Sequence, residues 1–170
     1  MLVRVYRRLS GGGRPIIVSA REALPAEVAA LIDAPLVLDA CGDAGPLGAL
    51  VSAASAVRTP LLFAAAGDAP NLEAPFVDAL ERAYDQARVA GPTPVAILPT
   101  WPDGAVEPLA ALYDTAAFLE GARTALDGGE RKVTAAIDAA RTRPYPLRHE
   151  DAEMLRNVNT PLDLEAAGRG

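Results

Sequence analysis

The stretch PLLFAAAGDAP at residues 60–70 decides how this chain folds. Its first seven residues are apolar, which is typical of a strand buried on both faces of a parallel sheet. Gly67 and Asp68 follow at once, and a glycine lets the backbone come close to a ligand. Pro75 then opens a helical pattern, because proline suits the first turn of a helix. A strand, a polar turn and a helix in this order predict an α/β fold.

The same alternation extends in both directions from this stretch. Strands are predicted at residues 15–20, 36–38, 60–66 and 93–98, and the first two are expected to be buried. Helices are predicted at residues 2–9, 25–32, 46–57 and from residue 75 onward. We expect a Rossmann-like, three-layer α/β fold with a mostly parallel sheet and helices on both faces. No internal repeat and no linker interrupts the pattern, so residues 1–170 are predicted to form a single domain.

The pattern loosens in the last third of the chain. An extended stretch is expected at residues 105–113, followed by helices at residues 115–127 and 131–141. Pro144 and Pro146 exclude the interior of a central strand, because proline cannot donate to a sheet ladder. Thr160, followed by Pro161, predicts the start of a last helix.

Composition excludes several classes of protein. A net charge of −6 leaves no basic surface for a nucleic-acid backbone. No apolar run approaches the roughly 20 residues that span a membrane, and Cys41 is the only cysteine, which excludes a disulfide within the chain. The first residues lack the apolar core of a signal peptide, so we expect a cytoplasmic protein.

Two carboxylates follow predicted strands, at the sheet edge where α/β proteins bind ligands. Asp39 comes after residues 36–38, and Asp68 comes after the most apolar strand. A carboxylate in such a position can hold a divalent cation together with substrate phosphates. Alternatively Asp68 caps the next helix, although Asn71 and Glu73 are closer to it.

Gly45, Pro46 and Leu47 open a helix directly after a loop. Free N–H groups at a helix start can bind an anion or a polar edge, and glycine leaves room for it. The alternative is that Gly45 ends the loop and Pro46 takes the first helical position without any ligand.

Three further segments each allow two interpretations. The glycine run after Ser10 follows a helix and precedes a strand, which indicates a connecting turn, not a phosphate loop. Arg131 and Lys132 lie where a helix start disfavours cations, so either an anion binds there or the side chains face solvent. Asn157 and Asn159 offer amides to a ligand or only form a turn.

Together these motifs form an ordered set over residues 15–165. They are Asp39 with GPLGAL at residues 45–50, GDAP at 67–70, EPLAALY at 107–113, GERKV at 129–133 and NVNTPLDL at 157–164. The set resembles the MobA-like nucleotidyltransferases, the molybdenum cofactor guanylyltransferase family. The resemblance implies a fold of the nucleotide-diphospho-sugar transferase type. It also implies transfer of GMP from GTP to molybdopterin, with Mg²⁺ as the cofactor and proteins of molybdenum insertion as partners.

The resemblance also assigns roles to the residues that match the motifs. Asp68 would be the catalytic metal ligand. The guanine nucleotide would be held by Asp39, Gly45, Pro46 and Leu47, and the pterin side would be formed by Arg131, Asn157 and Asn159.

One part of the family pattern is not found in this sequence. The family begins with a strand and a Gly-rich loop that carries Arg and Lys and grips the triphosphate, whereas the only lysine here is Lys132. A strand, a loop and the start of a helix together take on the order of 25 residues.

Three explanations are open. Either the full protein is longer and is the enzyme, or this is a non-catalytic paralogue that binds a nucleotide or pterin, or only the fold is shared. We expect the 170-residue chain alone to be weak or inactive. Without that first strand, the sheet should either have two unpaired inner edges, through which it could self-associate, or bring the neighbouring strands together to close the gap.

Overall fold

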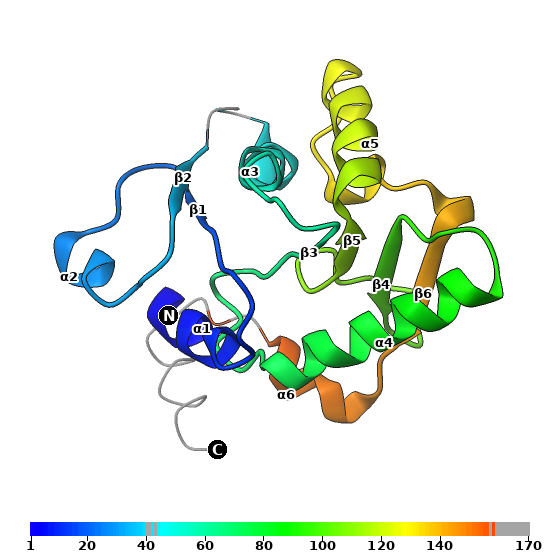
Figure 1. Cartoon of the computed structure of the whole chain (residues 1–170), viewed down its shortest axis with the longest axis horizontal. Helices are drawn as coiled ribbons and strands as arrows, with labels where there is room; N and C mark the ends of the chain where they lie inside the picture. Colours follow the sequence, from blue (N-terminus) through cyan, green and yellow to red (C-terminus); the bar gives the residue numbers. More distant parts are fainter. Residues whose placement is uncertain (40–41, 43, 157, 159–170) are drawn as a thin grey trace.

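Two separate β-sheets organise the chain in the computed structural model, which describes residues 1–39, 42, 44–156 and 158 (Figure 1). The smaller sheet pairs β1 (Val18–Ala20) with β2 (Leu36–Leu38) in parallel. The larger sheet has the order β3-β5-β4-β6, formed by β3 (Leu61–Phe63), β5 (Leu112–Asp114), β4 (Ala96–Thr100) and β6 (Thr142–Pro146).

The helices occupy most of the predicted positions. They are α1 (Leu2–Ser10), α2 (Ala26–Ala29), α3 (Gly45–Ala54), α4 (Ala74–Ala90), α5 (Thr115–Asp127) and α6 (Ala152–Leu155), with 3₁₀ helices η1 (Val133–Ala136), η2 (Ala139–Arg141) and η3 (His149–Asp151). The glycine run after Ser10 connects α1 to β1, as predicted. The helix expected from Thr160 onward lies outside the described residues.

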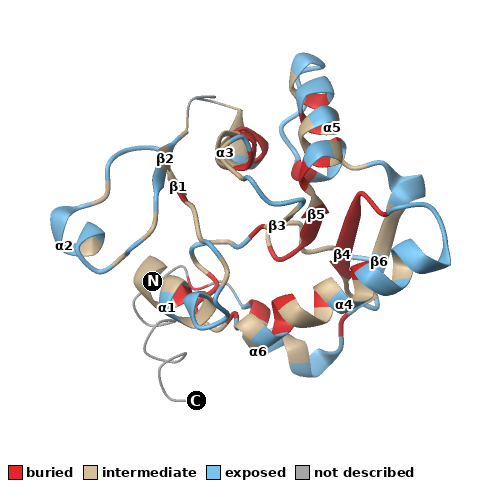
Figure 2. Ribbon diagram, in the orientation of Figure 1, coloured by how far each residue is buried: buried red, intermediate tan, exposed pale blue. Residues whose placement is uncertain are grey.

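The larger sheet has helices on both faces, which confirms the predicted layers. Alternate strand residues enter two hydrophobic cores, because successive side chains of a strand point to opposite faces. Leu62 and Tyr113 pack with α3 and α5 on one face. Ile97 and Leu112 pack with α4 on the other. Figure 2 shows β4 and β5 buried between these layers.

The larger sheet is mixed, whereas the sequence led us to expect mostly parallel pairing. β5 runs antiparallel to both β3 and β4, while β4 and β6 are parallel. The reason is the connection between β4 and β5, which contains a turn at Gly104 and no helix. A parallel neighbour needs a long crossover, usually helical, so a chain that turns back directly pairs antiparallel.

Two further expectations are corrected. Residues 131–141 form η1 and η2 in place of one α-helix, because Asp138 accepts a hydrogen bond from the Ala140 N–H at 2.9 Å and starts a new turn. β2 is a strand, but it is not buried. Leu36 is 39% and Leu38 is 52% exposed, because β2 lies at a sheet edge and α2 contributes no buried residue.

Pro144 and Pro146 lie in β6, at the edge of the larger sheet, which agrees with the expectation that they avoid a central strand. β1 and β3 are the edge strands that flank a large cavity between the two sheets. The unpaired inner edges expected from the sequence are therefore present among the described strands.

Candidate functional site

The start of α3 presents backbone donors that have no partner among the described residues. Gly45 has φ +63°, a left-handed conformation that favours glycine, and Pro46 follows as an exposed residue. The Gly48 N–H donates to the Ala44 carbonyl at 3.3 Å, which closes the first turn. The Gly45 and Leu47 N–H groups precede this bond, and no side chain caps the helix. The start of α3 is therefore suited to an anion or a polar edge.

Arg131 lies against this helix start. A Cβ atom placed on Gly45 would be 3.6 Å from the Arg131 Cβ and 3.7 Å from its carbonyl oxygen. Arg131 is itself exposed. The structure therefore brings together two predicted site segments that are far apart in the sequence. The contact places the backbone and Cβ of Arg131 beside the α3 start, and the Arg131 side chain has an interaction of its own.

Asp39 is attached to the same helix. Its backbone N–H donates to the Ala20 carbonyl at 2.9 Å, which continues the β1–β2 ladder. Its Oδ1 accepts a hydrogen bond from the Ser52 hydroxyl of α3 at 3.3 Å. Leu47, by contrast, has a fully buried side chain in the core. Only the backbone of Leu47 is available to a ligand.

Asp68 lies in a turn after β3 and is half-buried. Its carbonyl accepts a hydrogen bond from the Val158 N–H at 2.8 Å. This bond places the segment around Val158 beside Asp68, while Asn157 and Asn159 lie outside the described residues. Within the described part of the chain, the Asp68 carboxylate has no hydrogen-bond or ion-pair partner.

The capping alternative for Asp68 does not hold in the structure. The N-cap of α4 is Glu73, and its side chain makes no capping bond. Asn71 is used elsewhere, since it donates to the Glu153 carbonyl and accepts from Arg4, both at 3.1 Å. The Asp68 carboxylate therefore has no structural task among the described residues.

The donor set at Asp68 fits a hard divalent cation only in part. No group of three His, Cys, Asp or Glu side chains occurs among the residues that the structure describes. Mg²⁺ typically takes one or two carboxylates and completes its shell with water and substrate phosphates. One half-buried carboxylate without a partner meets that modest requirement.

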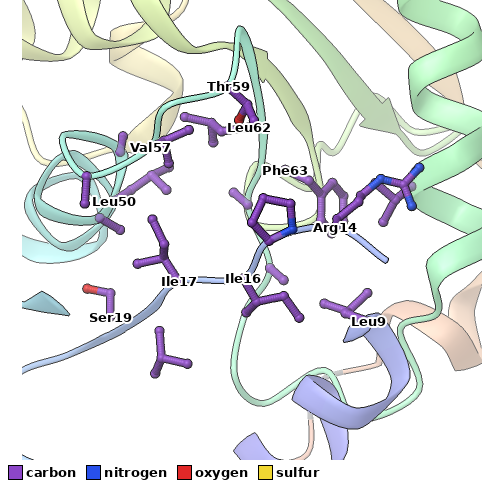
Figure 3. A pocket seen from close by; sticks show the side chains of 18 of the residues that line it. Leu9, Arg14, Ile16, Ile17, Ser19, Leu50, Val57, Thr59, Leu62 and Phe63 are labelled. Carbon is purple, nitrogen blue, oxygen red and sulfur yellow. The ribbon is translucent and has the colours of Figure 1, made fainter. Parts of the chain in front are cut away.

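Both halves of the candidate site border one cavity of about 960 Å³. Pro46, next to the α3 start, and Gly67, next to Asp68, line it from opposite elements. The rest of its wall is largely apolar and comes from α1, β1, α3 and β3 (Figure 3). The α3 start and the turn that contains Asp68 therefore both border a largely apolar cavity.

Comparison with known proteins agrees with this geometry. A family model described as a MobA-like NTP transferase domain matches residues 1–142. The chain belongs to the MobA-like NTP transferase family. The match runs from α1 into β6, so it includes the α3 start, Asp68 and Arg131. The resemblance inferred from the motifs is confirmed, and this MobA-like domain has a nucleotidyltransferase fold.

Individual relatives of the MobA-like domain point the same way. A probable molybdenum cofactor guanylyltransferase from Pyrococcus furiosus is 32% identical over 146 residues, which cover 76% of this chain and 69% of the relative. The molybdopterin-guanine dinucleotide biosynthesis protein A from Archaeoglobus fulgidus superposes with a TM-score of 0.72 at 22% identity, covering 98% and 83% of the two chains. The 2-C-methyl-D-erythritol 4-phosphate cytidylyltransferase from Thermus thermophilus gives a TM-score of 0.63 at 15% identity, covering 90% and 79%.

Sequence analysis of the MobA-like domain missed two polar contacts. The Trp101 indole N–H donates to Glu107 Oε1 at 2.7 Å, across the loop that follows β4. The sequence features that could have indicated this contact are the single tryptophan beside a predicted turn and Glu107 in the EPLAALY motif. Arg14 directly follows the glycine run that was predicted to be a connecting turn, and its side chain reaches α4.

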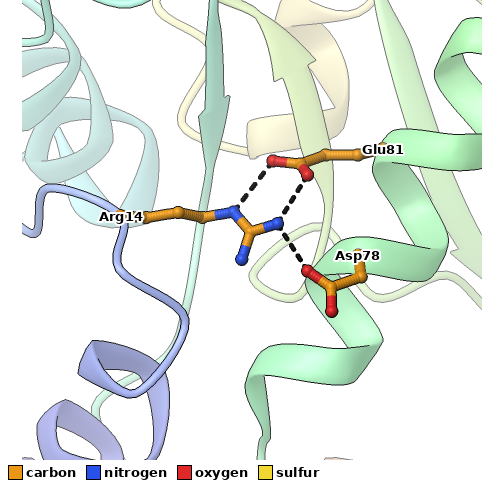
Figure 4. A network of polar contacts seen from close by, with 3 residues as sticks. All are labelled: Arg14, Asp78 and Glu81. Atoms are coloured by element: carbon orange, nitrogen blue, oxygen red, sulfur yellow. Dashed lines mark hydrogen bonds and ion pairs between the residues drawn. The ribbon is translucent and has the colours of Figure 1, made fainter.

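Arg14 forms a compact network with two carboxylates of α4 (Figure 4). Its Nε donates to Glu81 at 2.9 Å, and its Nη2 donates to Glu81 at 2.5 Å and to Asp78 at 2.6 Å. These bonds, first to Glu81 and then to Asp78, raise the pKa of the Arg14 guanidinium above its ordinary value. The network joins the segment that leads into β1 to α4, which packs on the larger sheet.

No helix among the described residues is both long and apolar enough to span a membrane.

Proposed function

We propose that this MobA-like domain transfers GMP from GTP to molybdopterin during molybdenum cofactor biosynthesis. The observation that carries the proposal is the half-buried Asp68 carboxylate, which has no partner among the described residues and follows β3 directly. Family membership and the 32% identical relative from Pyrococcus furiosus support it. Proteins of molybdenum insertion and a cytoplasmic location stay predictions that go with this activity.

The reaction is an in-line displacement at phosphorus. An oxygen of molybdopterin attacks the α-phosphorus of GTP, the bond from that phosphorus to the bridging oxygen breaks, and pyrophosphate leaves. Positioning and charge neutralisation account for most of the catalysis in such reactions. Mg²⁺ would supply charge neutralisation when bound, and Asp68 is the described residue whose carboxylate would hold it.

The residues at the α3 start would position the nucleotide. The Gly45 and Leu47 N–H groups would donate to a ligand at the helix start, where Pro46 lines the cavity. Asp39, attached to α3 through Ser52, would accept from donors of the guanine nucleotide. Arg131 lies beside Gly45, so we infer that the nucleotide and pterin sides meet at this corner. Asn157 and Asn159 are proposed to face the pterin.

The chain is proposed to need an additional strand and Gly-rich loop for full turnover. The sequence contains no Gly-rich loop that ends in Arg and Lys, and Lys132 lies far from the predicted position of such a loop. We expect the 170-residue chain to bind nucleotide but to transfer GMP weakly or not at all. The same observation favours the second candidate function, a non-catalytic nucleotide- or pterin-binding paralogue.

Calorimetry with Mg-GTP and the Asp68→Asn variant tests the binding part of this proposal. Asparagine keeps the size of the side chain but removes the charge, so we expect binding to weaken about tenfold or more. Asp127→Asn is the matched control, because Asp127 is an exposed carboxylate at the end of α5, and it should change nothing.

Equal affinity for Asp68→Asn and the unaltered chain would show that the Asp68 carboxylate does not take part in binding Mg-GTP. A separate assay follows GMP transfer with radiolabelled GTP and molybdopterin. Rapid transfer by the purified 170-residue chain would contradict the expected requirement for a further strand and loop. Nucleotide binding without any transfer would favour the paralogue.

A further inference from the structure

The loop that follows β4 brings an aromatic side chain to the same edge of the larger sheet as Asp68. β3 and β4 both run antiparallel to β5, so they run in the same direction and their carboxyl ends lie at one edge. Asp68 comes after β3, and Trp101 comes directly after β4. Ligands of open α/β sheets bind outside the carboxyl ends of the strands. Trp101 therefore lies at the edge where the proposed reaction takes place.

Glu107 lies between these two positions. The Ala66 N–H donates to the Leu109 carbonyl at 2.9 Å, which extends the antiparallel pairing of β3 with the segment that leads into β5. Asp68 lies two residues after Ala66, and Glu107 lies two residues before Leu109. Asp68 and Glu107 are therefore on neighbouring segments, both just beyond this bond.

The Trp101 ring is held in one orientation. Its indole N–H donates to Glu107 Oε1 at 2.7 Å. The backbone of the loop is fixed as well, since the Trp101 N–H donates to the Ala105 carbonyl at 2.7 Å. The Glu107 N–H donates to the Pro99 carbonyl at 2.9 Å. A side chain that is already fixed loses little freedom when a ligand binds to it, which favours binding.

The Trp101 ring is only half-buried. It packs against the hydrophobic core that α4 forms with the larger sheet, and the rest of its surface is accessible. The aromatic pairs of the described residues involve only phenylalanine and tyrosine, so no ring in this part of the chain stacks on Trp101. A fixed and half-exposed indole is suited to stacking on a planar ligand.

The Glu107 carboxylate can accept more than the bond from Trp101. A carboxylate has two oxygens and about four acceptor sites. Within the described part of the chain, the indole N–H is the one donor that reaches this side chain, and no cation pairs with it. Glu107 is itself half-buried. An acceptor with spare capacity therefore lies in contact with an aromatic ring.

We propose that Trp101 and Glu107 bind the pterin ring of the acceptor, with the indole stacked on the ring and the carboxylate accepting from its pyrimidine edge. That edge carries an amino group beside a ring N–H, two neighbouring donors that match the two oxygens of a carboxylate. The assignment of a pterin rests on the proposed function, which has molybdopterin as the acceptor.

Guanine presents the same edge, but its proposed site lies elsewhere. The nucleotide is assigned to the start of α3, which follows β2, whereas Trp101 follows β4. Figure 1 shows β3, which leads to Asp68, between β2 and β4. The two planar rings would therefore lie on opposite sides of Asp68. The attacking oxygen of molybdopterin is at the other end of the molecule from the pyrimidine edge, so that oxygen can reach the nucleotide while the ring rests on Trp101.

Tryptophan fluorescence tests this proposal directly, because Trp101 is the only tryptophan of the chain. The probe is 6-hydroxymethylpterin, titrated into the 170-residue chain. We expect saturable quenching of the tryptophan emission, with the same affinity in calorimetry. Lumazine, which has an oxygen in place of the amino group, is the matched ligand. It should bind about tenfold weaker or worse, because that oxygen would face the Glu107 carboxylate.

Variants separate the carboxylate from the ring. Glu107→Gln keeps the size of the side chain but removes the charge, so pterin should bind about tenfold more weakly and lose its advantage over lumazine. A merely structural role of Glu107 would not change that preference. Glu120→Gln is the control, because Glu120 is exposed on α5, and it should change nothing.

The ring is tested by calorimetry, since these variants lack the fluorophore. Trp101→Ala should weaken pterin binding about tenfold or more, because it removes the stacking surface. Trp101→Phe keeps an aromatic face and should recover part of the affinity. Equal affinities of both variants and the unaltered chain would overturn the role of the ring.

Three further results would overturn the proposal. They are the absence of saturable pterin binding, equal binding of lumazine and pterin, and quenching of Trp101 by GTP in competition with pterin. The last result would place guanine on Trp101 and Glu107. The Mg-GTP titration of Asp68→Asn distinguishes these results from failure of the proposed function. If Asp68→Asn binds Mg-GTP normally while pterin still quenches Trp101, the proposed transfer fails and the pterin site stands.

Discussion

β4 and β2 are both short apolar strands, but the structure treats them very differently. Within β4, Ala96 and Ile97 are almost completely buried, at 0% and 1% exposure, whereas Leu38 of β2 is 52% exposed. β4 has a strand on each side and helices on both faces of its sheet. β2 has β1 as its neighbour and belongs to the smaller sheet. Apolar composition is therefore enough to form a strand, but burial depends on what surrounds it.

The largest expected effect is a difference in stability between a substitution under the larger sheet and one in the smaller sheet. Leu80 of α4 is completely buried under the larger sheet. Leu80→Ala should lower the free energy of unfolding by about 2–5 kcal/mol, because it leaves a cavity in a packed core. Leu38→Ala, the matched change in β2, should cost no more than about 0.5 kcal/mol. Urea denaturation measures both, and equal losses would contradict the contrast.

A second substitution tests how closely the backbones of α5 and η1 pack beside the larger sheet. A Cβ atom on Gly121 of α5 would lie 2.2 Å from the Ala136 carbonyl oxygen of η1. Gly121→Ala should therefore destabilise the protein by about 1–3 kcal/mol, although alanine favours a helix. Gly91→Ala is the control, since a Cβ there meets nothing within 4 Å and its backbone is extended. A more stable Gly121→Ala variant in thermal unfolding would show that α5 and η1 do not pack this closely.

The smallest expected effect concerns the link between the halves. Arg14→Ala removes the bonds to Asp78 and Glu81, whose side chains are partly exposed, so the global loss should be about 1 kcal/mol. Exchange of the Val18 and Ala20 amides should quicken more than exchange in β4, because the loss is local to the smaller sheet. Arg88→Ala breaks a more exposed pair within α4 and serves as the control. Uniform changes in exchange across both sheets would contradict a linking role for Arg14.

Much of the fold follows from local pattern. The helix predicted at residues 115–127 has those bounds in the structure, because its first residue follows the capping carboxylate of Asp114 and its last precedes Gly128. The direction of each strand could not be predicted, because a short strand such as Leu112–Asp114 contains no information about the direction of its neighbour. The exposure of Leu36 could not be predicted either, because the sequence pattern describes the polarity of the side chains and not what packs against them.

The candidate site was predictable in its parts but not in its assembly. Asp68 and Gly45 stood out because polar or glycine residues directly after apolar strands and loops are suited to ligands. That Arg131 lies against Gly45 depends on the path of the chain after α5, which local periodicity does not encode. The reach of Arg14 to α4 is of the same kind, since it joins residues more than 60 positions apart.

The sequence by itself determined the order of strands and helices, the family resemblance and the types of residue that follow each strand. These depend on side-chain polarity and on glycine and proline, which act over a few neighbouring residues. Only the tertiary structure decided the mixed strand directions, the exposure of β2 and the cavity between the two sheets. Those features arise where distant segments meet, and there hydrogen-bond geometry and shared burial, not local preference, set the outcome.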